Sequence, residues 1–362
     1  MPFTSDGWQN VESNNYHALI PYCRHGPALC PRGSRPPASQ HPVSGLSDYY
    51  SNYRGKAPPY PGNKTCPILP TLNGTAAPDD LLYQNLLSAE WAIFPFYQKR
   101  VEMFNTSYFT ALGLPNTTYD RVQEIRDNDT GHLQIFQSQI LENSLKPGPC
   151  KYAFGVTNAE SFVVTLTLLE IASMTFITGL VQQANTLKTR GALAAIGETE
   201  SPHNTWALMS IWGSNPFGGP SDTAFPYFNE ILDTTNQFII PGSCPQGNPS
   251  YPYPNQKLPQ FTYNPKTNSS LTSGTEIEYI FTTPPPAWKA NTTYYAVFHH
   301  SILNVSMPFN TETNRTMIPN FELNKGLIAG VISDTLGAPT LDTVVAGPVL
   351  LVEQPTGAIK LA

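Results

Sequence analysis

Two short stretches of the sequence place a carboxylate and an imidazole three residues apart. Asp129 and His132 form one pair in "DNDTGH", and Glu200 and His203 form the other in "ETESPHN". Residues at i and i+3 share one face of a helix, so each pair can offer an oxygen and a nitrogen ligand to one metal ion. The same spacing also occurs in solvated surface pairs and turns, so a metal site requires further ligands.

Two more acidic residues stand in the middle of apolar runs, Glu90 in "NLLSAEWAIF" and Glu170 in "TLLEIASM". A buried carboxylate needs a cation, a proton or a hydrogen-bond donor. The order along the chain is carboxylate, carboxylate-x-x-His, carboxylate, carboxylate-x-x-His, which is typical of di-iron and di-manganese carboxylate bundles. Because hard oxygen ligands with one imidazole per ion suit Fe or Mn, we predict a dinuclear Fe or Mn site with the ligands Glu90, Asp129, His132, Glu170, Glu200 and His203.

The ligands require long helices to hold them, and apolar residues recur at helical spacing through most of the region 77–245. Four long helices and a shorter fifth are expected within 77–104, 117–144, 158–187, 187–213 and 221–240. The run 162–181 is long enough to cross a bilayer, but Glu170 at its centre favours a helix buried in a bundle. No transmembrane segment is therefore expected.

The regions on either side have a different character. Residues 1–76 are rich in proline and lack periodicity, which predicts an extended arm. Residues 246–362 contain β-branched and aromatic runs separated by Pro, Gly and Asn, which predicts a small all-β domain resembling a sandwich. The fold class is thus mainly α, a four-helix bundle with a C-terminal β domain.

Composition limits the partners and the compartment. The net charge of −6 comes without a basic run, which excludes a nucleic-acid surface, and only 13% of the residues are charged. Five cysteines form no CxxC pair. Nine N-x-S/T sequons, against about four expected by chance, favour a secreted glycoprotein located outside the cell or in the cell wall, although the first residues show no apolar signal-peptide segment.

Disulfide and glycan positions follow from that reading. Cys150 and Cys244 flank the predicted bundle and are expected to form a disulfide. Cys23 and Cys30 could close a small loop. Cys66 would then be the odd cysteine or pair with a partner. Asn128 lies in a predicted site helix and is expected to remain unmodified. The other sequons are the expected glycosylation sites: Asn63, Asn73, Asn105, Asn116, Asn268, Asn291, Asn304 and Asn314.

About 280 residues resemble the fungal Rds1-like stress-response family and the related plant desiccation-related proteins. The similarity rests on "LLSAEWAIFPFYQ", "VQEIRDNDTGHLQIF", "PGPCKYAFGVTNAESFV", "LLEIASMTFITG" and "ETESPHNTW", and on "TTYYAVFHHSILNVSMPF" and "VVAGPVLLVEQP" in the β region. The resemblance implies a ferritin-like domain whose ligand positions coincide with the six residues above. In that scheme Glu90 and Glu170 bridge the ions and the other four are terminal ligands.

Three residues depart from the family pattern. Asp129 stands where Glu is usual, and Trp91 follows Glu90 where His is common. Pro202 lies inside the second pair, where it removes a backbone donor and can kink the helix enough to turn His203 away.

Two functions from different classes follow. One is redox chemistry on O₂ or peroxide, or ferroxidase-like oxidation of iron, in a secreted ferritin-like protein. The other is a non-catalytic structural glycoprotein of the cell wall or matrix, with a metal-free bundle. A homo-oligomer is compatible with both.

Overall fold

The computed structural model describes residues 66–218, 238–248, 258–264, 274–321, 326–337, 339–340, 342–354 and 357–360. Nearly all of the predicted arm and most of the predicted fifth helix lie outside these residues, as do Cys23, Cys30, Asn63 and Asn268. The last residues of that predicted helix, 238–240, form a turn and an isolated bridge instead.

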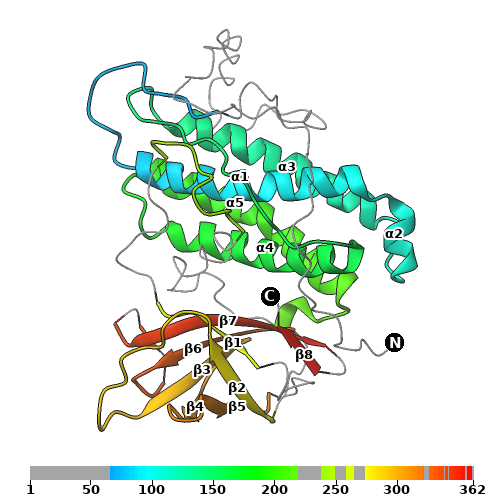
Figure 1. Ribbon diagram of the computed structural model, residues 1–362, viewed down its shortest axis with the longest axis vertical. Helices are drawn as coiled ribbons and strands as arrows, with labels where there is room; N and C mark the ends of the chain where they lie inside the picture. Colours follow the sequence, from blue (N-terminus) through cyan, green and yellow to red (C-terminus); the bar gives the residue numbers. More distant parts are fainter. Residues whose placement is uncertain are drawn as a thin grey trace.

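The described chain begins with a helical region and continues into antiparallel sheets (Figure 1). The mainly α fold class with a C-terminal β region is therefore confirmed. The helices are α1 (Asp80–Met103), α2 (Thr106–Ala111), α3 (Thr118–Gln139), α4 (Ala159–Leu180) and α5 (Leu187–Trp206), followed by a π-helical turn, η2 (Ala207–Ile211), and a 3-10 turn, η3 (Pro216–Gly218).

Side chains at the helix starts satisfy the backbone N–H groups that have no partner within the helix. At α4, Asn158 accepts a hydrogen bond from the Ser161 backbone and Ser161 accepts one in return, which forms a capping box. Thr186 caps α5 by accepting from the Thr189 backbone. Asp79, just before α1, accepts from the backbone of Asn185 at 2.7 Å and of Thr186 at 3.1 Å, so the starts of α1 and α5 are joined.

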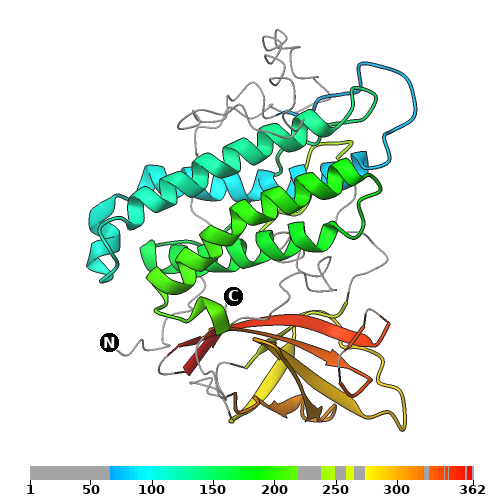
Figure 2. The same ribbon diagram turned by 180° about the vertical axis from the view of Figure 1, so that it is seen from behind.

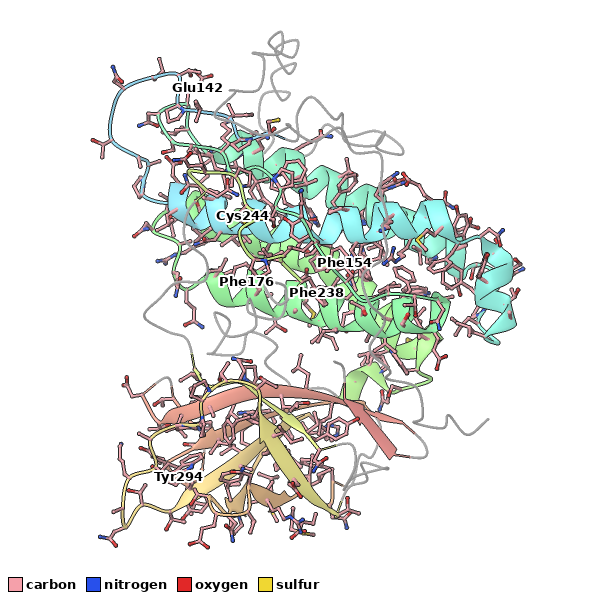
Figure 3. All side chains as sticks on the ribbon, in the orientation of Figure 1. Glu142, Phe154, Phe176, Phe238, Cys244 and Tyr294 are labelled. Atoms are coloured by element: carbon pink, nitrogen blue, oxygen red, sulfur yellow. A yellow bond between two sulfur atoms is a disulfide. The ribbon has the colours of Figure 1, made fainter. Side chains whose placement is uncertain are left out.

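The four long helices pack side by side, α1 against α3 and α4 against α5, with α1 also touching α4 (Figure 2). Apolar side chains fill the space between the helices (Figure 3). Phe96, Phe136 and Phe162 are fully buried. Helix α4 is apolar and long enough to cross a membrane, yet 89% of its most apolar window is buried inside the protein. It is a buried helix of the bundle, as Glu170 at its middle predicts.

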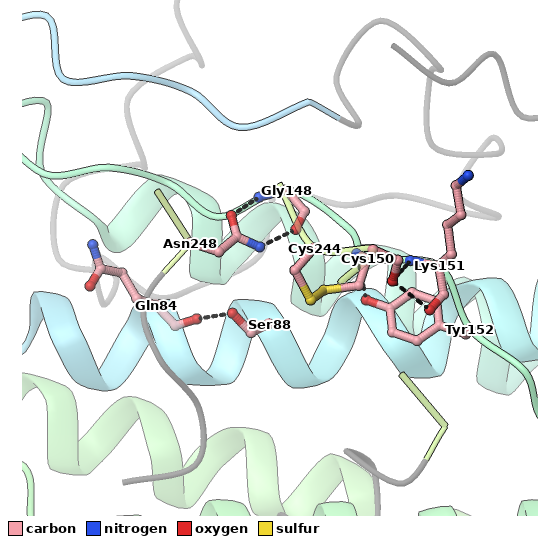
Figure 4. Close-up of a disulfide and its surroundings, with 9 residues drawn as sticks. Gln84, Ser88, Gly148, Cys150, Lys151, Tyr152, Cys244 and Asn248 are labelled. Carbon is pink, nitrogen blue, oxygen red and sulfur yellow. Dashed lines mark hydrogen bonds between the residues drawn. A yellow bond between two sulfur atoms is a disulfide. The ribbon is translucent and has the colours of Figure 1, made fainter. Parts of the chain in front are cut away.

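The predicted disulfide is present: Cys150 and Cys244 are joined across a sequence separation of 94 residues (Figure 4). Around it, Asn248 forms two hydrogen bonds with the backbone of Gly148, and Tyr152 pairs with Ile239 in an isolated bridge. Cys66 is also disulfide-bonded, so it is not a leftover free thiol.

Two antiparallel sheets follow the helices. The smaller has the order β1-β2-β5 and the larger the order β4-β3-β6-β7-β8. Their strands are β1 (Phe261–Tyr263), β2 (Glu276–Phe281), β3 (Tyr294–His300), β4 (Leu303–Phe309), β5 (Arg315–Met317), β6 (Gly326–Ser333), β7 (Val344–Gln354) and β8 (Gly357–Lys360). Tyr279 of the small sheet and Phe298 of the large sheet share one apolar core, which makes the pair sandwich-like.

The larger sheet lies against the helical region (Figure 1). Leu208 of the π-helical turn belongs to the same apolar cluster as Val297, Val331 and Leu350 of β3, β6 and β7. The bundle core is thus continuous with one face of the sheet.

Candidate metal centre

Each long helix contributes one of the four predicted carboxylate ligands. Glu90 lies on α1, Asp129 on α3, Glu170 on α4 and Glu200 on α5, and the exposed fraction of each residue is 3% or less. The two predicted imidazoles, His132 on α3 and His203 on α5, are buried as well. The structure therefore brings all six predicted ligands into the interior of the bundle.

Helical spacing explains why α3 turns its acidic face inward. Val122, Ile125, Leu133 and Phe136 form the apolar stripe of α3 and are buried in the bundle core. Asp129 lies one helical turn after Ile125 and one turn before Leu133. The packing of this stripe therefore buries Asp129 as well.

The donor atoms gather in two groups that share one residue. Glu90, Asp129 and His132 form one group, and Asp129, Glu200 and His203 form the other. Within each group the ligand atoms lie within 4.8 Å of one another. Asp129 thus occupies the common position, and its short side chain does not remove it from the site.

Glu170 belongs to neither group and is held by hydrogen bonds. Tyr97, which is fully buried on α1, donates its hydroxyl to Glu170 Oε1. His203 Nδ1 lies 3.1 Å from Glu170 Oε2. This geometry favours Asp129 over Glu170 as the residue between two ions.

The imidazoles complete the contacts between helices. His132 Nδ1 lies 3.0 Å from Glu200 Oε1, which brings α3 and α5 together. His203 Nδ1 lies 3.4 Å from Glu200 Oε2, and His203 Nε2 lies 2.9 Å from the side-chain amide of Asn128. Both histidines are therefore oriented toward the carboxylates.

Burial and crowding divide the acids into two classes. Burial, together with the negative charge of the other acids, raises the pKa values of Glu90 and Asp129 well above their usual range. Burial also raises the pKa of Glu170, although His203 and Tyr97 oppose it. Without a metal ion these acids are held toward their neutral forms.

Glu200 and His203 shift in the opposite sense. Burial acts to raise the pKa of Glu200, but the imidazoles of His132 and His203 outweigh it and hold that pKa far below its usual range. Burial acts to lower the pKa of His203, while Glu170 and Glu200 raise it to about 11. In the metal-free bundle these groups act as an internal ion pair.

Several buried donor atoms have no hydrogen-bond partner. Among them are Glu90 Oε1 and Asp129 Oδ2. Unpaired buried oxygens are costly and rare in folded proteins. Glu90 and Asp129 belong to the same donor group, so two of its three residues have an oxygen free to bind a metal ion.

Pro202 does not displace His203, contrary to the kink expected from the sequence. Helix α5 continues past Pro202 and ends at Trp206. Pro202 itself is exposed, whereas His203 is buried. A proline on the outer face loses one backbone hydrogen bond there. The irregularity falls later, where the helix changes to the π-helical turn η2.

Two residues near the centre were not among the predicted ligands. Tyr97 packs against Phe96 and Phe162 and also donates a hydrogen bond to Glu170. Asn128 was recognised only as a sequon, and its contact with His203 has no signal in the sequence because it depends on how α3 and α5 are rotated against each other.

Residues 80–211 match the family model of the ferritin-like domain. This range runs from the first residue of α1 to the last residue of η2 and contains all six predicted ligands. The helical region therefore forms a ferritin-like domain. No curated protein matches the chain.

Proposed function

We propose that this ferritin-like domain binds two Fe or Mn ions and uses them in redox chemistry. The observation that carries the proposal is the position of Asp129, which belongs to both donor groups at the centre of the bundle. A carboxylate shared by two sets of ligands is the arrangement that a dinuclear site requires.

The charges of the centre fit two divalent cations. Four carboxylates and two imidazoles converge in a region shielded by apolar side chains. Oxygen donors with one imidazole per ion suit Fe or Mn, and the shared carboxylate holds the two ions together. The unpaired oxygens of Glu90 and Asp129 would then have partners.

Glu90, Asp129 and His132 would hold one ion, and Asp129, Glu200 and His203 the other. Glu170 would lie beside His203 without binding an ion, held by its hydrogen bond from Tyr97. The bound metals would supply electron transfer to O₂ or peroxide, or a site where Fe²⁺ as substrate is oxidised. The apolar shell around them would keep bulk water away from the reaction.

The setting proposed for this chemistry is extracellular, in a protein of the stress-response and desiccation-related type. The disulfide between Cys150 and Cys244 suits an oxidising compartment. Among the predicted glycan sites, Asn73, Asn105 and Asn116 are exposed on the helical region. Asn291 and Asn304 are exposed in the β region, and Asn314 is half-buried there.

A second candidate function is a metal-free structural glycoprotein of the cell wall or matrix. The pairing of His203 with Glu170 and Glu200 favours it, because this pairing offsets part of the buried charge without any metal. The exposed sequons suit that role equally well.

Metal analysis of protein purified without chelators separates the two functions. We expect about two Fe or Mn ions per chain, the content of a dinuclear site. Asp129→Asn should lose both ions because both donor groups include Asp129. Asp120→Asn, an exposed carboxylate on the same helix, should lose none. Wild-type protein that stays metal-free after incubation with Fe²⁺ or Mn²⁺ would favour the structural glycoprotein.

A further inference from the structure

The two ring nitrogens of His203 face different surroundings. Nδ1 faces the centre, at 3.1 Å from Glu170 Oε2 and 3.4 Å from Glu200 Oε2. Nε2 faces α3, where the side-chain nitrogen of Asn128 lies 2.9 Å away. Since His203 and Glu200 belong to the same donor group, Nδ1 is the nitrogen placed to bind an ion.

A neutral imidazole carries one N–H and one lone pair. If Nδ1 gives its lone pair to a metal, the proton must sit on Nε2, and that N–H needs an acceptor. Metal-binding histidines nearly always have such an acceptor for their second nitrogen. At this position the neighbour is the Asn128 amide, whose oxygen accepts and whose nitrogen only donates.

As placed, the amide nitrogen of Asn128 faces Nε2 and suits only a ring nitrogen that carries no proton. A half-turn of the amide exchanges oxygen and nitrogen with almost no change of shape. Asn128 can therefore serve either tautomer of His203 from the same place.

We propose that Asn128 is a positioning residue of the metal centre: its side-chain oxygen accepts the Nε2 proton of His203 and so keeps Nδ1 free for the metal. This role rests on the proposed function, because Nδ1 needs to be kept free of a proton only if it binds a metal. It also gives α3 a third contribution to the site, beside Asp129 and His132.

The test compares two substitutions of similar shape. Asn128→Asp keeps an acceptor toward Nε2, whereas Asn128→Leu has none. Gln134→Glu adds a negative charge at an exposed position of the same helix and controls for the extra charge of the Asp variant. The metal-free full-length proteins, made in a host that adds no glycans, are titrated with Mn²⁺, and free Mn²⁺ is followed by electron paramagnetic resonance.

We expect Asn128→Leu to weaken Mn²⁺ binding by about 10- to 100-fold, the usual effect of losing the partner of a metal-bound histidine. Asn128→Asp should bind within a few-fold of wild type, and Gln134→Glu should match wild type. Unchanged circular dichroism of the metal-free variants shows that the fold is intact. Equal binding by Asn128→Leu and wild type would overturn the proposal, as would an Asp variant as weak as the Leu variant.

The tautomer itself gives a readout that simple packing would not change. In the Zn²⁺-loaded protein labelled with ¹⁵N-histidine, nuclear magnetic resonance should show the His203 proton on Nε2. A proton on Nδ1 would overturn the role of Asn128 while leaving metal binding in place. A wild-type protein that binds neither Mn²⁺ nor Zn²⁺ would overturn the proposed function and this inference together.

Discussion

The hydroxyl of Tyr97 on α1 donates a hydrogen bond to Glu170 Oε1 on α4, inside the bundle and fully shielded from water. This bond links the two helices next to the candidate centre, and it is one of two interactions that hold Glu170 beside the donor groups rather than in them.

Tyr97→Phe is therefore expected to destabilise the protein by about 1 to 3 kcal/mol, the cost of removing a buried donor from a carboxyl group. The metal content should stay at the wild-type value, because neither Tyr97 nor Glu170 belongs to a donor group. Urea unfolding and metal analysis measure the two effects. Tyr108→Phe, at an exposed tyrosine, should change neither. Loss of metal in Tyr97→Phe would show that Glu170 is a ligand after all.

Glu90→Gln should separate stability from metal binding. Burial and the nearby acids raise the pKa of Glu90, and its Oε1 has no hydrogen-bond partner. At neutral pH folding must either protonate Glu90 or bury its charge, and a neutral amide of the same shape removes that cost, so the metal-free variant should be more stable than wild type. The same change should weaken metal binding. Glu198→Gln, at an exposed site on α5, is the matched control.

A Glu90→Gln variant that is less stable than wild type in the absence of metal would contradict this account of the centre. It would mean that the carboxylate of Glu90 makes a favourable interaction in the metal-free fold.

Asp79 should make stability depend on acid pH. Burial acts to raise the pKa of Asp79, but hydrogen bonds from Asn185, Thr189 and Thr186 outweigh it, so the pKa lies below its usual value. A carboxylate with a lowered pKa stabilises the fold above the unfolded pKa, and this contribution disappears as the pH falls through the folded pKa.

Asp79→Asn should therefore cost about 1 to 2 kcal/mol at pH 7, a typical value for a lost helix-start contact, and clearly less near pH 3. Unfolding by urea at both pH values measures the difference. Asp342→Asn, at an exposed carboxylate in a turn, should show no such trend. A cost that is the same at both pH values would rule out the charge of Asp79 as its source.

Glycan mapping should distinguish Asn128 from the exposed sequons. Its amide nitrogen, the atom that a glycan would modify, lies 2.9 Å from His203 Nε2 inside the bundle. In protein secreted from a eukaryotic host, mass spectrometry should find glycans at Asn73, Asn105 or Asn116 and none at Asn128. A glycan at Asn128 on folded protein would contradict the half-buried position of this side chain beside His203.

Helical periodicity was sufficient to predict which residues turn inward. The apolar stripe of α3 places Asp129 and His132 in the core, and the uninterrupted apolar run of α4 leaves Glu170 no polar face to occupy. The order of the ligands along the chain then followed, and the ferritin-like match over residues 80–211 agrees with it.

The rotation of one helix against another cannot be read from periodicity, and the unpredicted features of the centre depend on it. Asp129 rather than Glu170 is shared between the donor groups, and Asn128 meets His203, because of how α3, α4 and α5 are turned. Short elements were missed for a different reason. Strands β1 and β5 have three residues each, too few for an alternation to appear in the sequence.

The bond between Cys150 and Cys244 closes a covalent ring that contains α4 and α5 but neither α1 nor α3. Glu170, Glu200 and His203 are therefore carried on the ring, and Glu90, Asp129 and His132 on the chain that leads into it. A protease that cuts once inside the ring leaves both pieces tethered, so the two halves of the centre stay together in oxidising surroundings. After a cut inside the ring, the pieces separate only when a reductant also breaks the disulfide.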